Sequence, residues 1–62
     1  MNGELRELLK SVPDSYDDFV QGTASMLKKS ESAQEKMIQY LKENPDSQTD
    51  DVLDYLDELL GL

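Results

Sequence analysis

Residues 43–61 read ENPDSQTDDVLDYLDELLG, and this stretch carries the signals of one amphipathic helix from its start to its end. The proline near its beginning ends any preceding helix, because the residue before a proline is pushed out of the α region. A polar turn follows, and Thr49 or Asp50 is expected to open the new helix. Apolar residues then recur at spacings of three and four until Gly61, which suits a C-terminal cap. The stretch therefore predicts a helix over residues 49–60.

The same helical period runs through the rest of the chain, and no segment alternates strictly as a half-buried strand would. Prolines and polar clusters divide this remainder into three further segments. Helices are predicted at about residues 3–12, 14–29, 32–43 and 49–60. Asp14 or Ser15 is expected to cap the second helix, and Ser32 with Glu35 forms a capping box for the third.

The boundary between the second and third helices allows two interpretations. The apolar stripe stays in phase across residues 30–32, so one helix from residue 14 to residue 43 fits the period. A break is favoured, because a serine-rich cluster interrupts the stripe and because one long helix could not bury both halves of its stripe compactly. We therefore expect an all-α fold: a compact small bundle of three principal helices plus a short N-terminal helix packed across them, in a single domain over residues 1–62.

The expected core is small, since only 37% of the residues are hydrophobic and no cysteine is present to form a disulfide. Its predicted centre consists of Leu8, Leu9, Phe19, Val20, Leu27, Ile38, Leu41, Val52, Leu53, Leu56 and Leu60. Gly22 falls inside the second helix, where glycine costs roughly 1 kcal/mol relative to alanine. Close approach of a neighbouring helix is the favoured explanation, with a bend in the helix as the alternative.

Two segments fifteen positions apart resemble each other. Residues 36–41 read KMIQYL and residues 51–56 read DVLDYL. Two copies are too few for a solenoid, which needs three or more repeats to bury its faces. The similarity is therefore interpreted as two amphipathic helices of related pattern.

The side chains that most often carry out catalysis at neutral pH are missing, since the chain has no histidine and no cysteine. Its serines would need an activating base, and the bases available are lysines and carboxylates spaced as on a surface. A bundle of this size also offers little room for a substrate cleft. We therefore expect no enzymatic activity and no cofactor.

The acids around the polar turn have an incomplete resemblance to a calcium loop. With Asp46 counted first, Asp51 takes the sixth position, where such loops need glycine. Asp57 takes the twelfth, where a bidentate glutamate is expected. The pattern is therefore interpreted as helix capping, and no metal ligand is predicted.

Asp14-Ser15-Tyr16 resembles the Asp-Ser-Leu at the pantetheine attachment site of acyl carrier proteins, which are also small, acidic and helical. The resemblance covers two identical residues, and in that family the serine follows a long first helix. It implies a carrier-like protein modified at Ser15, which is the weakest of the functional hypotheses.

Charge is distributed unevenly along the chain. Of 14 acidic and six basic residues, residues 1–42 hold seven acids and all six bases, and residues 43–62 hold seven acids and no base. On the last predicted helix, one acidic stripe opposite the leucines is formed by Asp50, Asp54, Asp57 and Glu58. This stripe is either a solvated face that keeps the protein soluble or a docking surface for a basic partner.

The preferred hypothesis is a non-enzymatic protein–protein interaction module with a basic protein as its partner. The alternative is an acidic inhibitor or nucleic-acid mimic that occupies a basic surface of its partner. Direct nucleic-acid binding is not expected, because the net charge is −8. Membrane insertion is not expected either, because no apolar run exceeds two residues. Without a basic stretch and an apolar export segment, a cytoplasmic location and a monomer or weak homo-oligomer are the default expectations.

Overall fold

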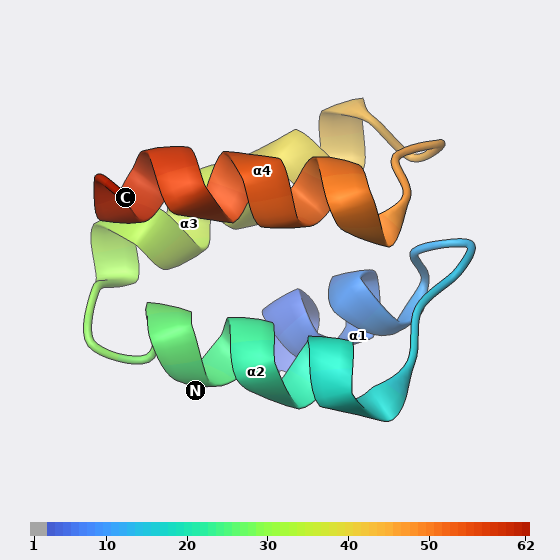
Figure 1. Cartoon of the computed structure of the whole chain (residues 1–62), viewed down its shortest axis with the longest axis horizontal. Helices are drawn as coiled ribbons and strands as arrows, with labels where there is room; N and C mark the ends of the chain where they lie inside the picture. Colours follow the sequence, from blue (N-terminus) through green and yellow to red (C-terminus); the bar gives the residue numbers. More distant parts are fainter. Residues whose placement is uncertain (1–2) are drawn as a thin grey trace.

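Four helices joined by short connections make up residues 3–62, the part of the chain that the computed structural model describes (Figure 1). These helices are α1 (Gly3–Lys10), α2 (Asp17–Leu27), α3 (Glu31–Glu43) and α4 (Thr49–Leu60). No strand occurs among these residues, so the expected all-α bundle is confirmed. Residues 1–2 of the expected domain lie outside the described part.

Consecutive helices run in opposite directions, with α2 and α4 on the near side of Figure 1 and α1 and α3 behind them. The eight-residue α1 packs against α2 and α3, and α3 contacts each of the other three helices. Short connections favour this up-and-down arrangement, because each one can only return the chain antiparallel to the helix before it. The bundle measures 25 × 21 × 21 Å along its principal axes.

The break between α2 and α3 is confirmed, and the alternative of one continuous helix is wrong. The Ser30 hydroxyl oxygen accepts a hydrogen bond from the Ala33 backbone N–H at 3.2 Å and so caps α3. The Gln34 side chain donates to the Leu27 carbonyl oxygen at 2.8 Å, at the end of α2. The predicted Ser32 capping box is wrong, because α3 already begins at residue 31 and Ser30 occupies the capping position.

The cap predicted for the second helix is also wrong. α2 begins at Asp17, and its N-cap residue is Tyr16, which makes no capping hydrogen bond with its side chain. The Asp14 carboxylate instead accepts two hydrogen bonds from Thr49, the first residue of α4. The backbone N–H of Thr49 donates at 2.7 Å and its hydroxyl donates at 3.0 Å. Asp14 therefore ties the α1–α2 connection to the start of α4.

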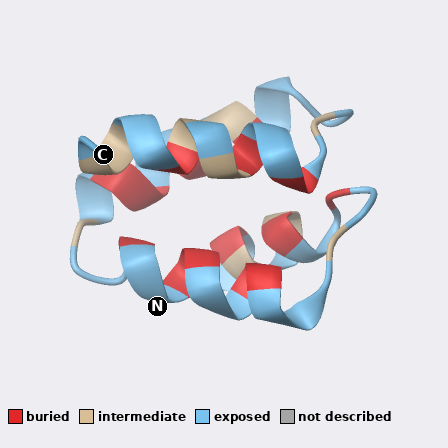
Figure 2. Cartoon of the chain, viewed as in Figure 1, coloured by how far each residue is buried: buried red, intermediate tan, exposed pale blue. Residues whose placement is uncertain are grey.

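Buried residues from all four helices face one another across the centre of the bundle (Figure 2). The buried hydrophobic residues are Leu5, Leu9, Val12, Phe19, Val20, Ala24, Leu27, Ala33, Met37, Ile38, Leu41, Val52 and Leu56. The predicted centre is confirmed except at Leu8, Leu53 and Leu60, which are half-buried and pack against its edge. Leu5 and Met37, absent from the predicted centre, are fully buried.

The two glycines singled out by the sequence behave differently. Gly61 has the left-handed φ of 74° that a C-terminal cap requires, as predicted, and Leu62 N–H donates to the Asp57 carbonyl at 2.9 Å. Gly22 is exposed, and no described atom comes within 4 Å of the position that a Cβ would take. The expected close approach of a helix at Gly22 is therefore wrong.

Candidate functional site

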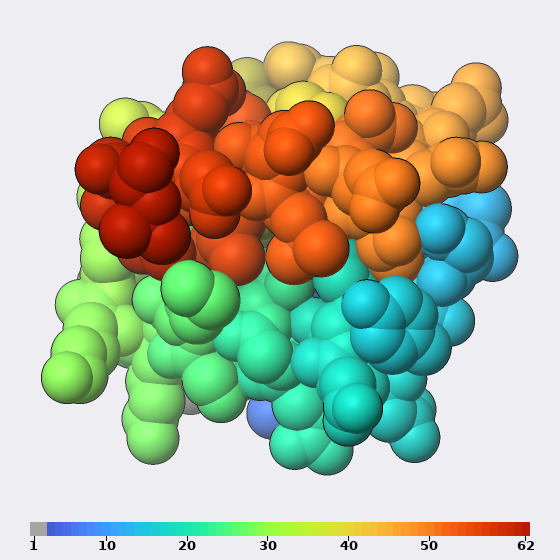
Figure 3. Space-filling view, in the orientation of Figure 1, coloured from blue at the N-terminus to red at the C-terminus, as the bar shows by residue number. Residues whose placement is uncertain are grey.

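The four acids predicted to form a stripe all lie exposed on α4, on the side opposite the buried Val52 and Leu56. In the space-filling view α4 runs along the upper part of one face of the molecule, beside α2 (Figure 3). Within residues 3–62, none of these four carboxylates takes part in an ion pair or a side-chain hydrogen bond. No base within residues 3–62 pairs with them, so their charges are open to solvent and counterions.

Three of the four acids also line one shallow hollow on the surface between α3 and α4. Asp54, Asp57 and Glu58 share this hollow with Asp51, Tyr40 and Tyr55, and these six residues define what we call the tyrosine hollow. Asp50 does not line it. Asp51 lies one turn before Tyr55 on the same face of α4, and its Oδ2 accepts the Gln48 backbone N–H at 3.1 Å.

The aromatic pair in this hollow was not predicted as part of a site. The rings of Tyr40 on α3 and Tyr55 on α4 are stacked, with centroids 4.3 Å apart and planes inclined by 11°. Both side chains are half-buried, and the Ser47 hydroxyl lies 3.5 Å from the Tyr40 hydroxyl. A signal was present in the sequence, since Tyr40 and Tyr55 occupy the same position in the two similar segments 36–41 and 51–56.

The acidic character continues beyond the hollow to the α3–α4 turn. A second shallow depression there is lined by Glu43, Asp46 and Asp51, together with neutral residues of the turn. The base nearest to this region in sequence, Lys42, has its ammonium group 2.6 Å from the carboxylate of Glu4 on α1. Negative potential is therefore expected along the whole outer side of α4 and into the preceding turn.

The hydroxyl of Ser15, the residue of the carrier hypothesis, is buried and has no hydrogen-bond partner within residues 3–62. A group transferred to this oxygen would need the α1–α2 connection to open first. In this conformation the serine therefore lacks the accessibility that a modification site requires.

The acids around the polar turn do not gather into a metal site. Among residues 3–62 no group of three or more acidic side chains is placed to hold a metal ion. α4 begins at Thr49, inside the segment that resembled a calcium loop, so the acids that follow are spread along a helix.

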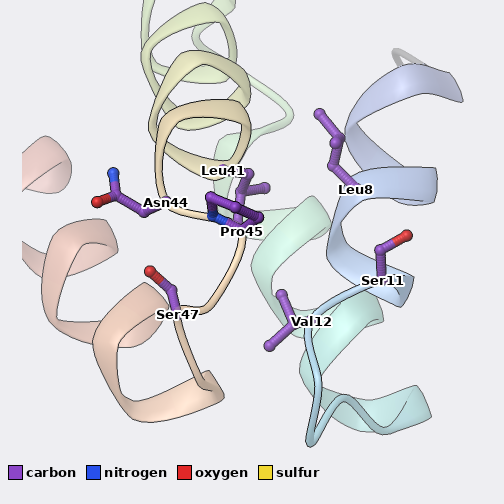
Figure 4. Close-up of a pocket in the computed structure, with 7 residues that line it drawn as sticks. All are labelled: Leu8, Ser11, Val12, Leu41, Asn44, Pro45 and Ser47. Carbon is purple, nitrogen blue, oxygen red and sulfur yellow. The ribbon is translucent and has the colours of Figure 1, made fainter.

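A separate hollow of about 140 Å³ lies where the α1–α2 connection meets the α3–α4 turn (Figure 4). Its lining is mostly apolar and contains no titratable side chain; it is formed by Leu8, Ser11, Val12, Leu41, Asn44, Pro45 and Ser47. The hydroxyls of Ser11 and Ser47 are in this lining, but no lining residue is a base that could activate them as nucleophiles.

None of the helices formed by residues 3–62 is long and apolar enough to cross a membrane. Comparison of the chain with protein families, curated proteins and solved structures finds no match.

Proposed function

We propose that this protein is a non-enzymatic binding module that docks a basic segment of another protein against α4. The docking surface is the α4 acidic face, which we define as Asp50, Asp51, Asp54, Asp57 and Glu58. The observation that carries the proposal is the concentration of these exposed carboxylates on one helix, with no base in residues 43–62.

This concentration opposes the stability of α4. Each like-charge pair at i and i+4, such as Asp50 with Asp54 or Asp54 with Glu58, costs about 0.2–0.5 kcal/mol on a helix. Asp57 and Glu58 also lie in the last turn, where the helix dipole favours bases over acids. A basic partner would remove both penalties on binding, whereas solubility requires no such concentration, because acids interspersed with bases serve it equally well.

Opposite charge on the partner would act mainly on the rate of association. Long-range attraction raises the association rate constant, and added salt lowers it by screening. The individual ion pairs at such an exposed surface are worth about 0.2–1 kcal/mol each. Loss of three carboxylates is therefore expected to weaken binding by about threefold to 140-fold.

The test compares two variants that lose the same three negative charges. Asp54→Asn, Asp57→Asn and Glu58→Gln are combined in one, and Glu7→Gln, Asp18→Asn and Glu35→Gln, all exposed residues on other helices, are combined in the other. Titration calorimetry with an eight-residue peptide of alternating arginine and serine measures Kd at low and high salt. We expect the α4 variant to bind much more weakly than the control variant. Equal weakening of both would show that only net charge matters and would overturn the proposal.

A further inference from the structure

We infer that the tyrosine hollow is an arginine-selective contact point within this docking surface, an inference that rests on the proposed function. The observation that carries it is the stacked pair of Tyr40 and Tyr55. An acidic surface could attract a basic segment without any such aromatic pair. The hollow thus combines an aromatic platform with carboxylates, and these two features together suit one kind of cation.

The tyrosine pair is a preorganised platform. Its two rings come from adjacent antiparallel helices and hold each other in place by stacking at 4.3 Å. Both tyrosines are anchored in helices: Tyr40 lies three residues before the end of α3, and Tyr55 lies five residues before the end of α4. A side chain that stacks on this pair therefore meets rings whose orientation is fixed before binding.

The carboxylates are placed around Tyr55 by the period of α4. Asp51 precedes Tyr55 by four residues and Glu58 follows it by three, so both lie on its face of the helix. Their Cα atoms are displaced along the axis by about 6 Å and 4.5 Å from that of Tyr55. A cation over the ring would thus have one carboxylate one turn before it and another one turn after it.

Arginine fits this combination better than lysine. A guanidinium is planar, stacks on aromatic faces and donates to carboxylates from its edges at the same time. The ammonium of lysine is a compact and strongly hydrated charge that gains less from an aromatic platform. For each arginine that makes a cation–π contact at this exposed site, we expect Kd of the arginine peptide to be about twofold to fivefold lower than Kd of the lysine peptide.

The test measures Kd for two peptides of equal charge, one of four Arg-Ser repeats and one of four Lys-Ser repeats. Wild type is compared with Tyr55→Leu, which removes the ring, and with Tyr55→Phe, which keeps it. Tyr16→Leu is the control, because Tyr16 is 54% exposed and lies at the start of α2. We expect tighter binding of the arginine peptide by wild type, Tyr55→Phe and Tyr16→Leu, and a smaller difference between the two peptides for Tyr55→Leu.

The possible outcomes separate this inference from the proposed function. Equal affinity of wild type for both peptides, with both weakened by the α4 charge variant, would overturn arginine selectivity and leave the docking surface intact. An arginine preference as large in Tyr55→Leu as in wild type would also overturn it. If the α4 charge variant binds both peptides as tightly as wild type does, the proposed function itself is wrong. Proton NMR of the tyrosine rings in wild type gives a readout that needs no variant: ring resonances of Tyr40 and Tyr55 unmoved by the arginine peptide would refute the contact.

Discussion

Replacement of Asp14 by alanine tests the link between the α1–α2 connection and α4. The change removes the acceptor of two hydrogen bonds, from the backbone N–H of Thr49 at 2.7 Å and from its hydroxyl at 3.0 Å. Thr49 is buried, with 6% of its surface exposed, so water replaces these bonds poorly. The backbone N–H belongs to the first turn of α4, where helices lack internal acceptors.

The expected cost follows from the two bonds. Loss of a carboxylate cap costs about 1 kcal/mol. Loss of the second bond, from the Thr49 hydroxyl to the carboxylate, costs roughly a further 1 kcal/mol, because the Asp14 side of this bond is exposed to water. Melting temperatures of domains this small shift by about 4–8 °C for each kcal/mol, so Asp14→Ala is expected to lower Tm by about 8–16 °C.

Thermal unfolding followed by circular dichroism at 222 nm provides the measurement. Asp46→Ala is the matched control, because Asp46 is exposed in a turn, carries the same charge and has no hydrogen bond or ion pair from its side chain within residues 3–62. Asp14→Asn keeps one acceptor oxygen and should fall between wild type and Asp14→Ala. If Asp14→Ala melts within 2 °C or so of the Asp46→Ala control, the reasoning about this cap is refuted.

Three further predictions concern stability. Gly22→Ala should raise Tm by about 4–8 °C, because the added methyl group meets open space and alanine gains about 1 kcal/mol over glycine inside a helix; an unchanged or lower Tm would contradict it. Thr23→Val should stabilise the fold by about 1 kcal/mol in urea unfolding, because the Thr23 hydroxyl is buried without a partner in the described part of the chain; a loss of stability would reveal a favourable role for that hydroxyl. Sodium chloride should raise the Tm of wild type by screening repulsion along α4, and should raise the Tm of a variant with Asp54→Asn, Asp57→Asn and Glu58→Gln by a smaller amount; equal salt effects on both proteins would count against repulsion on this helix.

The features predicted correctly depend on neighbours in sequence. The break after α2, the helix at residues 49–60 and the cap at Gly61 are each set by short-range patterns of capping, spacing and backbone preference. The period also showed which side of each helix faces the core. Leu5 and Met37 were not predicted at the centre of the core, because burial there depends on which helices pack together.

The features that sequence reasoning missed join segments far apart in the chain. Asp14 was expected to cap the helix that follows it, yet its carboxylate contacts Thr49, 35 positions away. A local pattern identifies a capping residue but not the helix end that it reaches. The tyrosine hollow was missed for the same reason, since Tyr40 and Tyr55 meet only after α3 and α4 pack antiparallel. The acids of the stripe were placed correctly on the exposed side of α4, because helical period alone determines that side.

The contact between Gln34 and the end of α2 makes the helices dependent on one another for their formation. The amide of this side chain donates to the carbonyl oxygens of Leu27 and Lys28, so the last turn of α2 gains these bonds only when α3 is folded and docked. Helices of 8 to 13 residues are marginal in isolation, and none of those that residues 3–62 form is longer. Folding is therefore expected to be highly cooperative, with amide hydrogens of α2 and α3 exchanging through the same global opening. A ligand held on α4 would then slow hydrogen exchange in α2 as well, although it touches no residue of that helix.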